Sequence, residues 1–218
     1  SGIKNTFRYL EEHGFILEVF SKNHGKIIIF DMINFLPKHL ISLNNNNFSN
    51  KVGKDYLTLP GVFSEKGVDE ASKFLASYFN KNLKGNIADI GSGWGYLSAE
   101  ALKKSKEIKK IYLYEINKKS LEISKQNIKD KRAVFKWVDI FQDNEILFNF
   151  DQIICNPPFH KGLKVDFDLG KKFIIKSSEM LKKKGSLLLV ANINMPYEKT
   201  LKNYFQIVEL ISFNKNFK

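Results

Sequence analysis

Two short segments of this 218-residue chain combine residue types that can carry out chemistry. The first, Asn156-Pro157-Pro158-Phe159-His160, follows the apolar run 152–155. An amine on an aromatic ring has its lone pair delocalised, so a site must accept its two N–H hydrogens to restore electron density on nitrogen. An asparagine side-chain oxygen and a proline carbonyl can do this, while a phenylalanine stacks on the flat ring, as enzymes that act on extruded bases require. The segment predicts transfer to an amino nitrogen, with catalytic residues Asn156, Pro157, Pro158 and Phe159.

The second segment is a glycine-rich loop, Asp89-Ile90-Gly91-Ser92-Gly93-Trp94-Gly95, which follows an apolar run and opens a helical pattern. Its backbone N–H groups face whatever ligand binds at the carboxyl end of the preceding strand. A nicotinamide fingerprint would have its third glycine one position later and would bind a pyrophosphate, which Asp89 would repel. The loop therefore favours a cationic ligand such as S-adenosylmethionine, and the two segments together predict methyl transfer.

Carboxylates at the ends of the next two predicted strands extend this cofactor site. Glu115 is placed to accept both ribose hydroxyls and Asp139 to accept the adenine amino group, with Ile116 and Ile140 as apolar plates around the ring. Either acid alone would be read as a solvated loop carboxylate. All three acids, however, fall at consecutive strand ends, the edge where open α/β sheets bind ligands. The predicted cofactor contacts are Asp89, Gly91, Ser92, Gly93, Glu115, Ile116, Asp139, Ile140 and Asn156.

The elements that must position these residues alternate along the chain. After Gly85, apolar runs of strand length alternate with helical patterns, the order that builds a mostly parallel sheet with helices on both faces. The predicted strands are 87–90, 111–115, 134–138, 152–155, 186–191 and 207–213. The predicted helices are 69–79, 94–104, 118–129 and 167–183. Residues 17–20 and 27–30 predict a hairpin, so we expect a small α+β extension over 1–55 and an α/β domain over 56–218.

Charge and composition indicate a polyanionic partner. The chain has 35 Lys and Arg against 23 Asp and Glu, a net charge of +12 that favours nucleic acid. An AT-biased genome would also enrich any protein in Lys, Asn and Ile. Cys155 is the only cysteine, which excludes an intrachain disulfide and a zinc cluster and fits a cytoplasmic setting. No apolar stretch has the length of a membrane span, and we expect neither a membrane nor a metal partner.

Asp89–Gly95 and Asn156–His160, together with Leu59-Pro60-Gly61-Val62-Phe63-Ser64, resemble the class I, S-adenosylmethionine-dependent "methyltransferase small" family. The resemblance covers roughly residues 56–218 and is strongest to the members that methylate guanine N2 in small-subunit ribosomal RNA. It implies a Rossmann-like fold with a seven-stranded sheet, S-adenosylmethionine as cofactor and ribosomal RNA as partner. In that family the loop that carries Phe63 packs over the cofactor, so Phe63 joins the predicted cofactor contacts.

Other functions share parts of this pattern. Glutamine-N5 and adenine-N6 methyltransferases also carry an Asn-Pro-Pro-aromatic segment, and a catalytically inert RNA-binding module could retain the fold. Intact Asn156, Asp89 and Glu115 argue against the inert module, and Asp89 argues against a nicotinamide oxidoreductase. His160 has two readings of equal weight, a contact with the base or a phosphate and a structural support for its loop.

Overall fold

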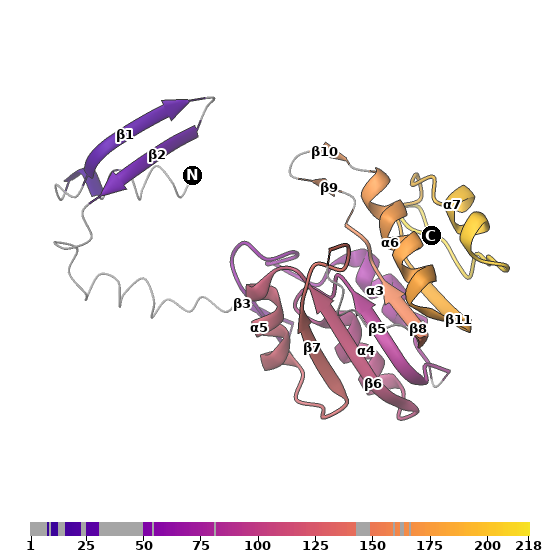
Figure 1. Ribbon diagram of the computed structural model, residues 1–218. Helices are drawn as coiled ribbons and strands as arrows, with labels where there is room; N and C mark the ends of the chain where they lie inside the picture. Colours follow the sequence, from indigo (N-terminus) through magenta and orange to yellow (C-terminus); the bar gives the residue numbers. More distant parts are fainter. Residues whose placement is uncertain are drawn as a thin grey trace. The chain divides into compact units, whose positions relative to one another are not determined.

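The computed structural model describes residues 8, 10–12, 16–22, 25–30, 50–53, 55–80, 82–142, 149–158, 160–161, 164–165 and 167–218. The chain divides into two units, Ser1–Phe48 and Ser49–Lys218. In the first, β1 (Ile16–Lys22) and β2 (Gly25–Phe30) pair as the predicted antiparallel hairpin (Figure 1). The second opens with a short hairpin of β3 (Asn50–Val52) and β4 (Tyr56–Thr58). Val52 is buried in the core of this second unit, ahead of the expected boundary after residue 55.

Five parallel strands form the central sheet of the second unit, in the order β11-β8-β5-β6-β7 (Figure 1). In chain order they are β5 (Gly85–Ile90), β6 (Ile108–Glu115), β7 (Ala133–Trp137), β8 (Phe150–Cys155) and β11 (Leu181–Leu189). A two-residue hairpin of β9 (His160–Lys161) and β10 (Lys164–Val165) follows β8. Since β5 lies between β8 and β6, the segments after these three strands are neighbours at one edge of the sheet.

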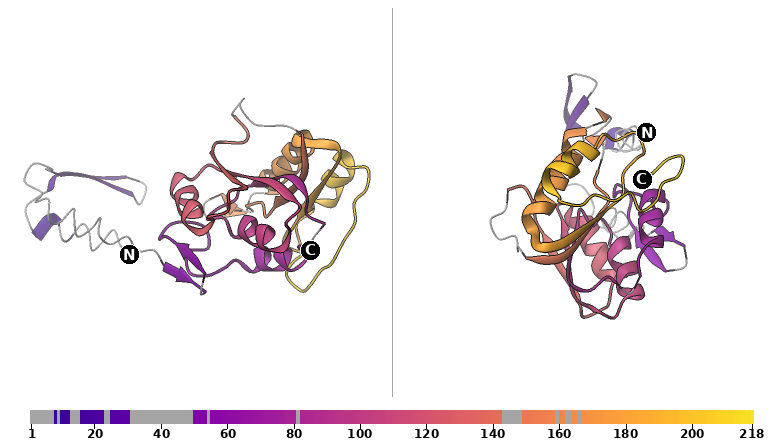
Figure 2. Two further views of the ribbon diagram at one scale, coloured as in Figure 1. Left: turned by 90° about the horizontal axis from the view of Figure 1, so that it is seen from below. Right: turned by 90° about the vertical axis from the view of Figure 1, so that its right-hand side faces the viewer.

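Helices pack on both faces of this sheet (Figure 2). They are α3 (Glu70–Ser77), α4 (Tyr96–Lys104), α5 (Lys118–Asn127), α6 (Phe167–Met180) and α7 (Glu198–Tyr204). Alternate strand residues face opposite sides, so Ile87 packs in one core with α3, α4 and α5, whereas Ala88 packs in another with Phe173 of α6. None of the described helices combines the length and apolar character that crossing a bilayer requires.

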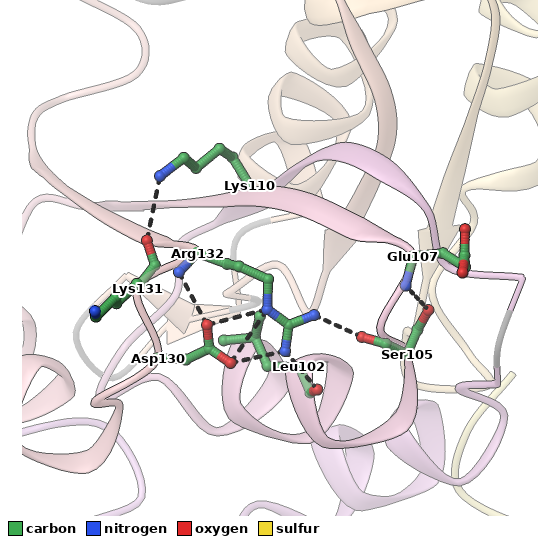
Figure 3. A network of polar contacts seen from close by, with 7 residues as sticks. All are labelled: Leu102, Ser105, Glu107, Lys110, Asp130, Lys131 and Arg132. Carbon is green, nitrogen blue, oxygen red and sulfur yellow. Dashed lines mark hydrogen bonds and ion pairs between the residues drawn. The ribbon is translucent and has the colours of Figure 1, made fainter.

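Arg132 joins the end of α4 to the start of β7, at the amino ends of the strands (Figure 3). Its guanidinium donates to the carbonyls of Ser105 at 2.8 Å and Leu102 at 2.9 Å, and pairs with Asp130 at 2.7 Å. It therefore satisfies backbone acceptors that the last turn of a helix leaves unpaired. This network is structural, because the candidate site lies at the opposite edge of the sheet.

Two sequence-based predictions of the fold are wrong. Residues 207–213 form no strand, and Ile207 and Phe213 are 77% and 66% exposed. Apolar composition favours an extended chain, but a strand also needs a partner for its N–H and C=O groups. Ala191, just after β11, exchanges hydrogen bonds with Lys218 instead. The described residues thus give a five-stranded sheet rather than the expected seven. In addition, α6 ends at Met180, because Leu181 already pairs with Phe150 of β8.

Candidate active site

The predicted site residues meet where the parallel strands end. Asp89 lies near the end of β5, Glu115 ends β6, and Asn156 directly follows β8. Asp89 is in register with Ile154 of β8 on one side and with Leu113 of β6 on the other. The sheet therefore places the glycine-rich loop between the candidate catalytic segment and the candidate ribose-binding acid, as expected for an open α/β sheet.

The glycine-rich loop requires its glycines for conformation and for space. Gly91, Gly93 and Gly95 have φ values of 72°, 55° and 90°, in the left-handed region that favours glycine. A Cβ on Gly95 would lie 2.9 Å from Cδ1 of Ile128, whereas a Cβ on Gly93 would have no atom within 4 Å. The backbone is therefore packed against the protein at Gly95 and open at Gly93, which is the arrangement needed to admit a ligand close to the main chain.

Glu115 fixes the conformation of this loop. Its Oε2 accepts a hydrogen bond from Gly93 N at 2.7 Å, and its Oε1 accepts one from Asn117 N at 2.7 Å. Each carboxylate oxygen can still accept another donor. The structure thus places Glu115 beside the loop, and its predicted contact with ribose hydroxyls stays a prediction.

Asp89 and Ser92 supply two buried polar atoms with no hydrogen-bond partner among the described residues, Asp89 Oδ1 and Ser92 Oγ. The other oxygen of Asp89 accepts from Ser98 Oγ at 2.6 Å. Burial raises the pKa of Asp89 to about 7, opposed by the hydrogen bonds from Ser98 and reinforced by the charge of Glu115. A buried acceptor without a donor is costly, so a cationic ligand that also donates hydrogen bonds fits this position.

The side chain of Asn156 is held in one orientation. Its Nδ2 donates to Asp69 Oδ2 at 2.8 Å and to Ser72 Oγ at 2.9 Å. Asp69 is the N-cap of α3, and the same Oδ2 accepts from Ser72 N at 2.8 Å. No described residue donates to Asn156 Oδ1, which remains the acceptor of this amide. Sequence reasoning missed Asp69 and Ser72 as site residues, although Asp69 has the type and position of a helix cap.

The loop before α3 lies against the glycine-rich loop. Trp94 Nε1 donates to the carbonyl of Phe63 at 3.1 Å, while the Phe63 side chain is 56% exposed. The contribution of Trp94 was also missed, because an indole within a glycine-rich motif gives no sign of its distant partner. Residues 62 and 64–70 line an open hollow of about 500 Å³ that runs to Asp69. The segment from Phe63 to Asp69 therefore contacts both the glycine-rich loop, through Trp94, and the candidate catalytic segment, through Asn156.

The remaining predicted residues are placed as follows. Ile140 is buried, Ile116 is 64% exposed, and Asp139 Oδ1 accepts from Phe141 N in the turn after β7. Pro157 is buried and Pro158 is exposed. Phe159 and the side chain of His160 lie outside the described residues. Stacking by Phe159, and the adenine contacts of Asp139, Ile116 and Ile140, stay predictions.

Comparison with known proteins relates this site to a family. A family model described as a methyltransferase small domain matches residues 54–218. The chain is 33% identical over 225 residues to the ribosomal RNA small subunit methyltransferase C of Buchnera aphidicola subsp. Schizaphis graminum, covering 100% of this chain and 64% of that relative. It is 37% identical over 161 residues to the protein of that name from Hamiltonella defensa subsp. Acyrthosiphon pisum, covering 74% of this chain and 48% of that relative. The chain thus spans only part of the length of these curated relatives.

A solved structure has a similar fold. It is the T. thermophilus 16S rRNA N2 G1207 methyltransferase (RsmC) in complex with AdoMet and guanosine, with a TM-score of 0.64 and 21% sequence identity. The match covers 93% of this chain and 50% of that chain. At this identity the likeness concerns the fold, and it confirms the predicted Rossmann-like α/β architecture.

Proposed function

Because this chain belongs to the methyltransferase small family, we propose that it transfers a methyl group from S-adenosylmethionine to the N2 amine of a guanine in RNA. Ribosomal RNA of the small subunit is the proposed substrate, since the relatives are named for it. The net charge of +12 supports a nucleic-acid partner. A ribosomal substrate also agrees with the cytoplasmic setting expected from the lone cysteine.

The residues around the glycine-rich loop fit the proposed cofactor. When bound, S-adenosylmethionine supplies a sulfonium-activated methyl group. The charged methionine portion of the cofactor would donate to Asp89 Oδ1, and Ser92 Oγ would donate to it or accept from it; neither atom has a partner among the described residues. The open side of Gly93 gives the main chain room to approach it. Glu115 would serve the ribose, with Asp139, Ile116 and Ile140 around the adenine and Phe63 in the covering loop.

The observation that carries the proposal is the fixed amide of Asn156. With Nδ2 bonded to Asp69 and Ser72, Oδ1 is left to accept an N–H of the guanine amine. The carbonyl of Pro157 would accept the second N–H, and Phe159 would stack on the base. Acceptors that draw both N–H bonds out of the plane of the ring reduce conjugation of the nitrogen lone pair with the ring. The lone pair can then point at the methyl group. The chain's main contribution is positioning, which is worth several kcal/mol when reacting atoms are held in line.

The proposal is tested by incubating the chain with methyl-labelled S-adenosylmethionine and small-subunit ribosomal RNA, then digesting the RNA to nucleosides for mass spectrometry. The expected product is N2-methylguanosine. Label in N6-methyladenosine would support the adenine alternative, and label in a glutamine-containing release-factor peptide would support the glutamine alternative. Binding of the cofactor by calorimetry without transfer to any of these acceptors would favour an inert RNA-binding module.

A further inference from the structure

We infer that Asp69 and Ser72 are positioning residues that select the orientation of the Asn156 amide and so present its carbonyl oxygen to the acceptor amine. This inference rests on the proposed function and adds to it two residues outside both motifs. The contacts span 87 positions to Asp69 and 84 to Ser72. They connect the start of α3 to the end of β8, on the face of the sheet that α3 and α4 cover.

The two contacts differ in what they specify. A hydroxyl can donate or accept, so Ser72 Oγ would tolerate either end of the Asn156 amide. An ionised carboxylate only accepts, so Asp69 Oδ2 at 2.8 Å admits Nδ2 and repels Oδ1. Asp69 therefore selects the orientation, and Ser72 supplies the second acceptor for the two amide hydrogens.

Orientation matters because the two ends of an amide have opposite effects on an amine. If the Asn156 side chain turned over, Nδ2 would face the acceptor and would compete for the lone pair that attacks. With Nδ2 held by a carboxylate, the amide is also polarised, which makes Oδ1 a stronger acceptor. The negative charge of Asp69 further stabilises the positive charge that develops on the amine nitrogen as the methyl group arrives.

Asp69 also has a purely structural task, which any test must separate from orientation. Its Oδ2 accepts from Ser72 N and caps α3. Asp69→Ser retains a good N-cap residue, but its shorter side chain carries no charge and does not reach Asn156. Asp69→Asn keeps both the cap and the reach without the charge. Ser77→Ala, on the same helix, removes an exposed hydroxyl that donates to Phe74 O and serves as a matched control for Ser72→Ala.

The first measurement is independent of activity. In ¹H–¹⁵N spectra of the full chain, the Asn156 side-chain amide is assigned by its disappearance in Asn156→Ala. Slow hydrogen exchange of both amide protons is expected in the wild type and fast exchange in Asp69→Ser/Ser72→Ala. Fast exchange in the wild type would overturn the inference whatever reaction the chain catalyses.

The second measurement is steady-state methylation of RNA. Asp69→Ser is expected to lower kcat by about 10- to 100-fold, the usual effect of losing a hydrogen bond to a charged group. KM for RNA and Kd for S-adenosylmethionine should stay within about twofold, Asp69→Asn should recover part of the loss, and Ser77→Ala should have no effect. An unchanged kcat in Asp69→Ser would refute the positioning role. Protected amide protons in a wild type that makes no N2-methylguanosine would instead refute the proposed reaction and leave the orientation standing.

Discussion

Substitution of Asp89 by Asn should change how stability depends on pH. Burial raises the pKa of Asp89 from its ordinary value of 3.8 to about 7 in the folded chain. A carboxyl whose pKa is raised by folding contributes stability that is complete below the unfolded value and is lost as pH rises through the folded value. The difference is about three pKa units, and at about 1.4 kcal/mol for each unit it corresponds to about 4 kcal/mol.

The assay is urea unfolding of wild type and Asp89→Asn from pH 4.5 to pH 8. The variant has no charge to bury. Between about pH 4 and pH 7 the free energy of unfolding of the wild type should therefore fall relative to that of the variant by up to about 1.4 kcal/mol per pH unit. Above about pH 7 the difference should level off. Titrating groups distant from Asp89 contribute equally to both proteins and cancel in the difference.

Asp130→Asn provides a control of opposite sign. The hydrogen bonds from Arg132 hold the pKa of Asp130 below its ordinary value of 3.8, so its contribution is complete above that value and is lost only in stronger acid. The difference in free energy of unfolding between Asp130→Asn and wild type should not vary over the same pH range. Saturating S-adenosylmethionine, a cation, should reduce the pH dependence of the difference in free energy of unfolding between Asp89→Asn and wild type. A difference for Asp89→Asn that does not vary with pH would refute the reasoning that burial keeps this carboxyl protonated.

Four further perturbations test the site and its support. Asn156→Ala should lower kcat by about 100- to 1,000-fold, as loss of one oriented polar group at a reacting centre does, while calorimetry shows cofactor affinity within about twofold of wild type; near-normal turnover would mean that another group accepts the amine hydrogens. Gly95→Ala should lower the free energy of unfolding by about 1–3 kcal/mol more than Gly53→Ala does. Both glycines have positive φ, but of the two only Gly95 lacks room for a Cβ; equal costs would show that Ile128 moves freely. Arg132→Ala should cost about 1–3 kcal/mol of stability without lowering kcat, and Arg132→Lys should recover little because a lysine lacks the guanidinium fork; full recovery in the lysine variant would mean that charge alone matters. Filter binding of RNA should weaken steeply as salt rises, and a salt-independent affinity would mean that the excess of Lys and Arg does not contact phosphate.

The sequence predicted that the two candidate site segments with local signals would lie side by side. The loop Asp89–Gly95 and the segment after Cys155 each follow an apolar strand, and the carboxyl ends of parallel strands necessarily share one edge of a sheet. Their meeting in the structure follows from strand order alone. The alternation of apolar runs and helical patterns likewise predicted all five strands of the sheet, with shifts at their ends.

Contacts between distant segments could not be predicted in the same way. Asp69 was expected at the start of a helix, and capping explains an aspartate there completely, so nothing in the sequence indicated its second partner, Asn156. Glu115 was expected to face a ribose, yet its side chain also holds Gly93 N. The segment 207–213 has strand composition, but pairing depends on which backbone lies beside it, and that is a property of the folded chain.

One oxygen atom, Oδ2 of Asp69, accepts both the N–H that begins α3 and the amide of Asn156. Fraying of that first helical turn, which holds Ala71 of the core, therefore releases the Asn156 side chain while the sheet and most of its two cores stay intact. Since helix ends open far more readily than a core does, gentle warming should abolish the proposed methyl transfer before the protein unfolds. Heat sensitivity of turnover and heat sensitivity of the fold would then be two separate properties of the same molecule.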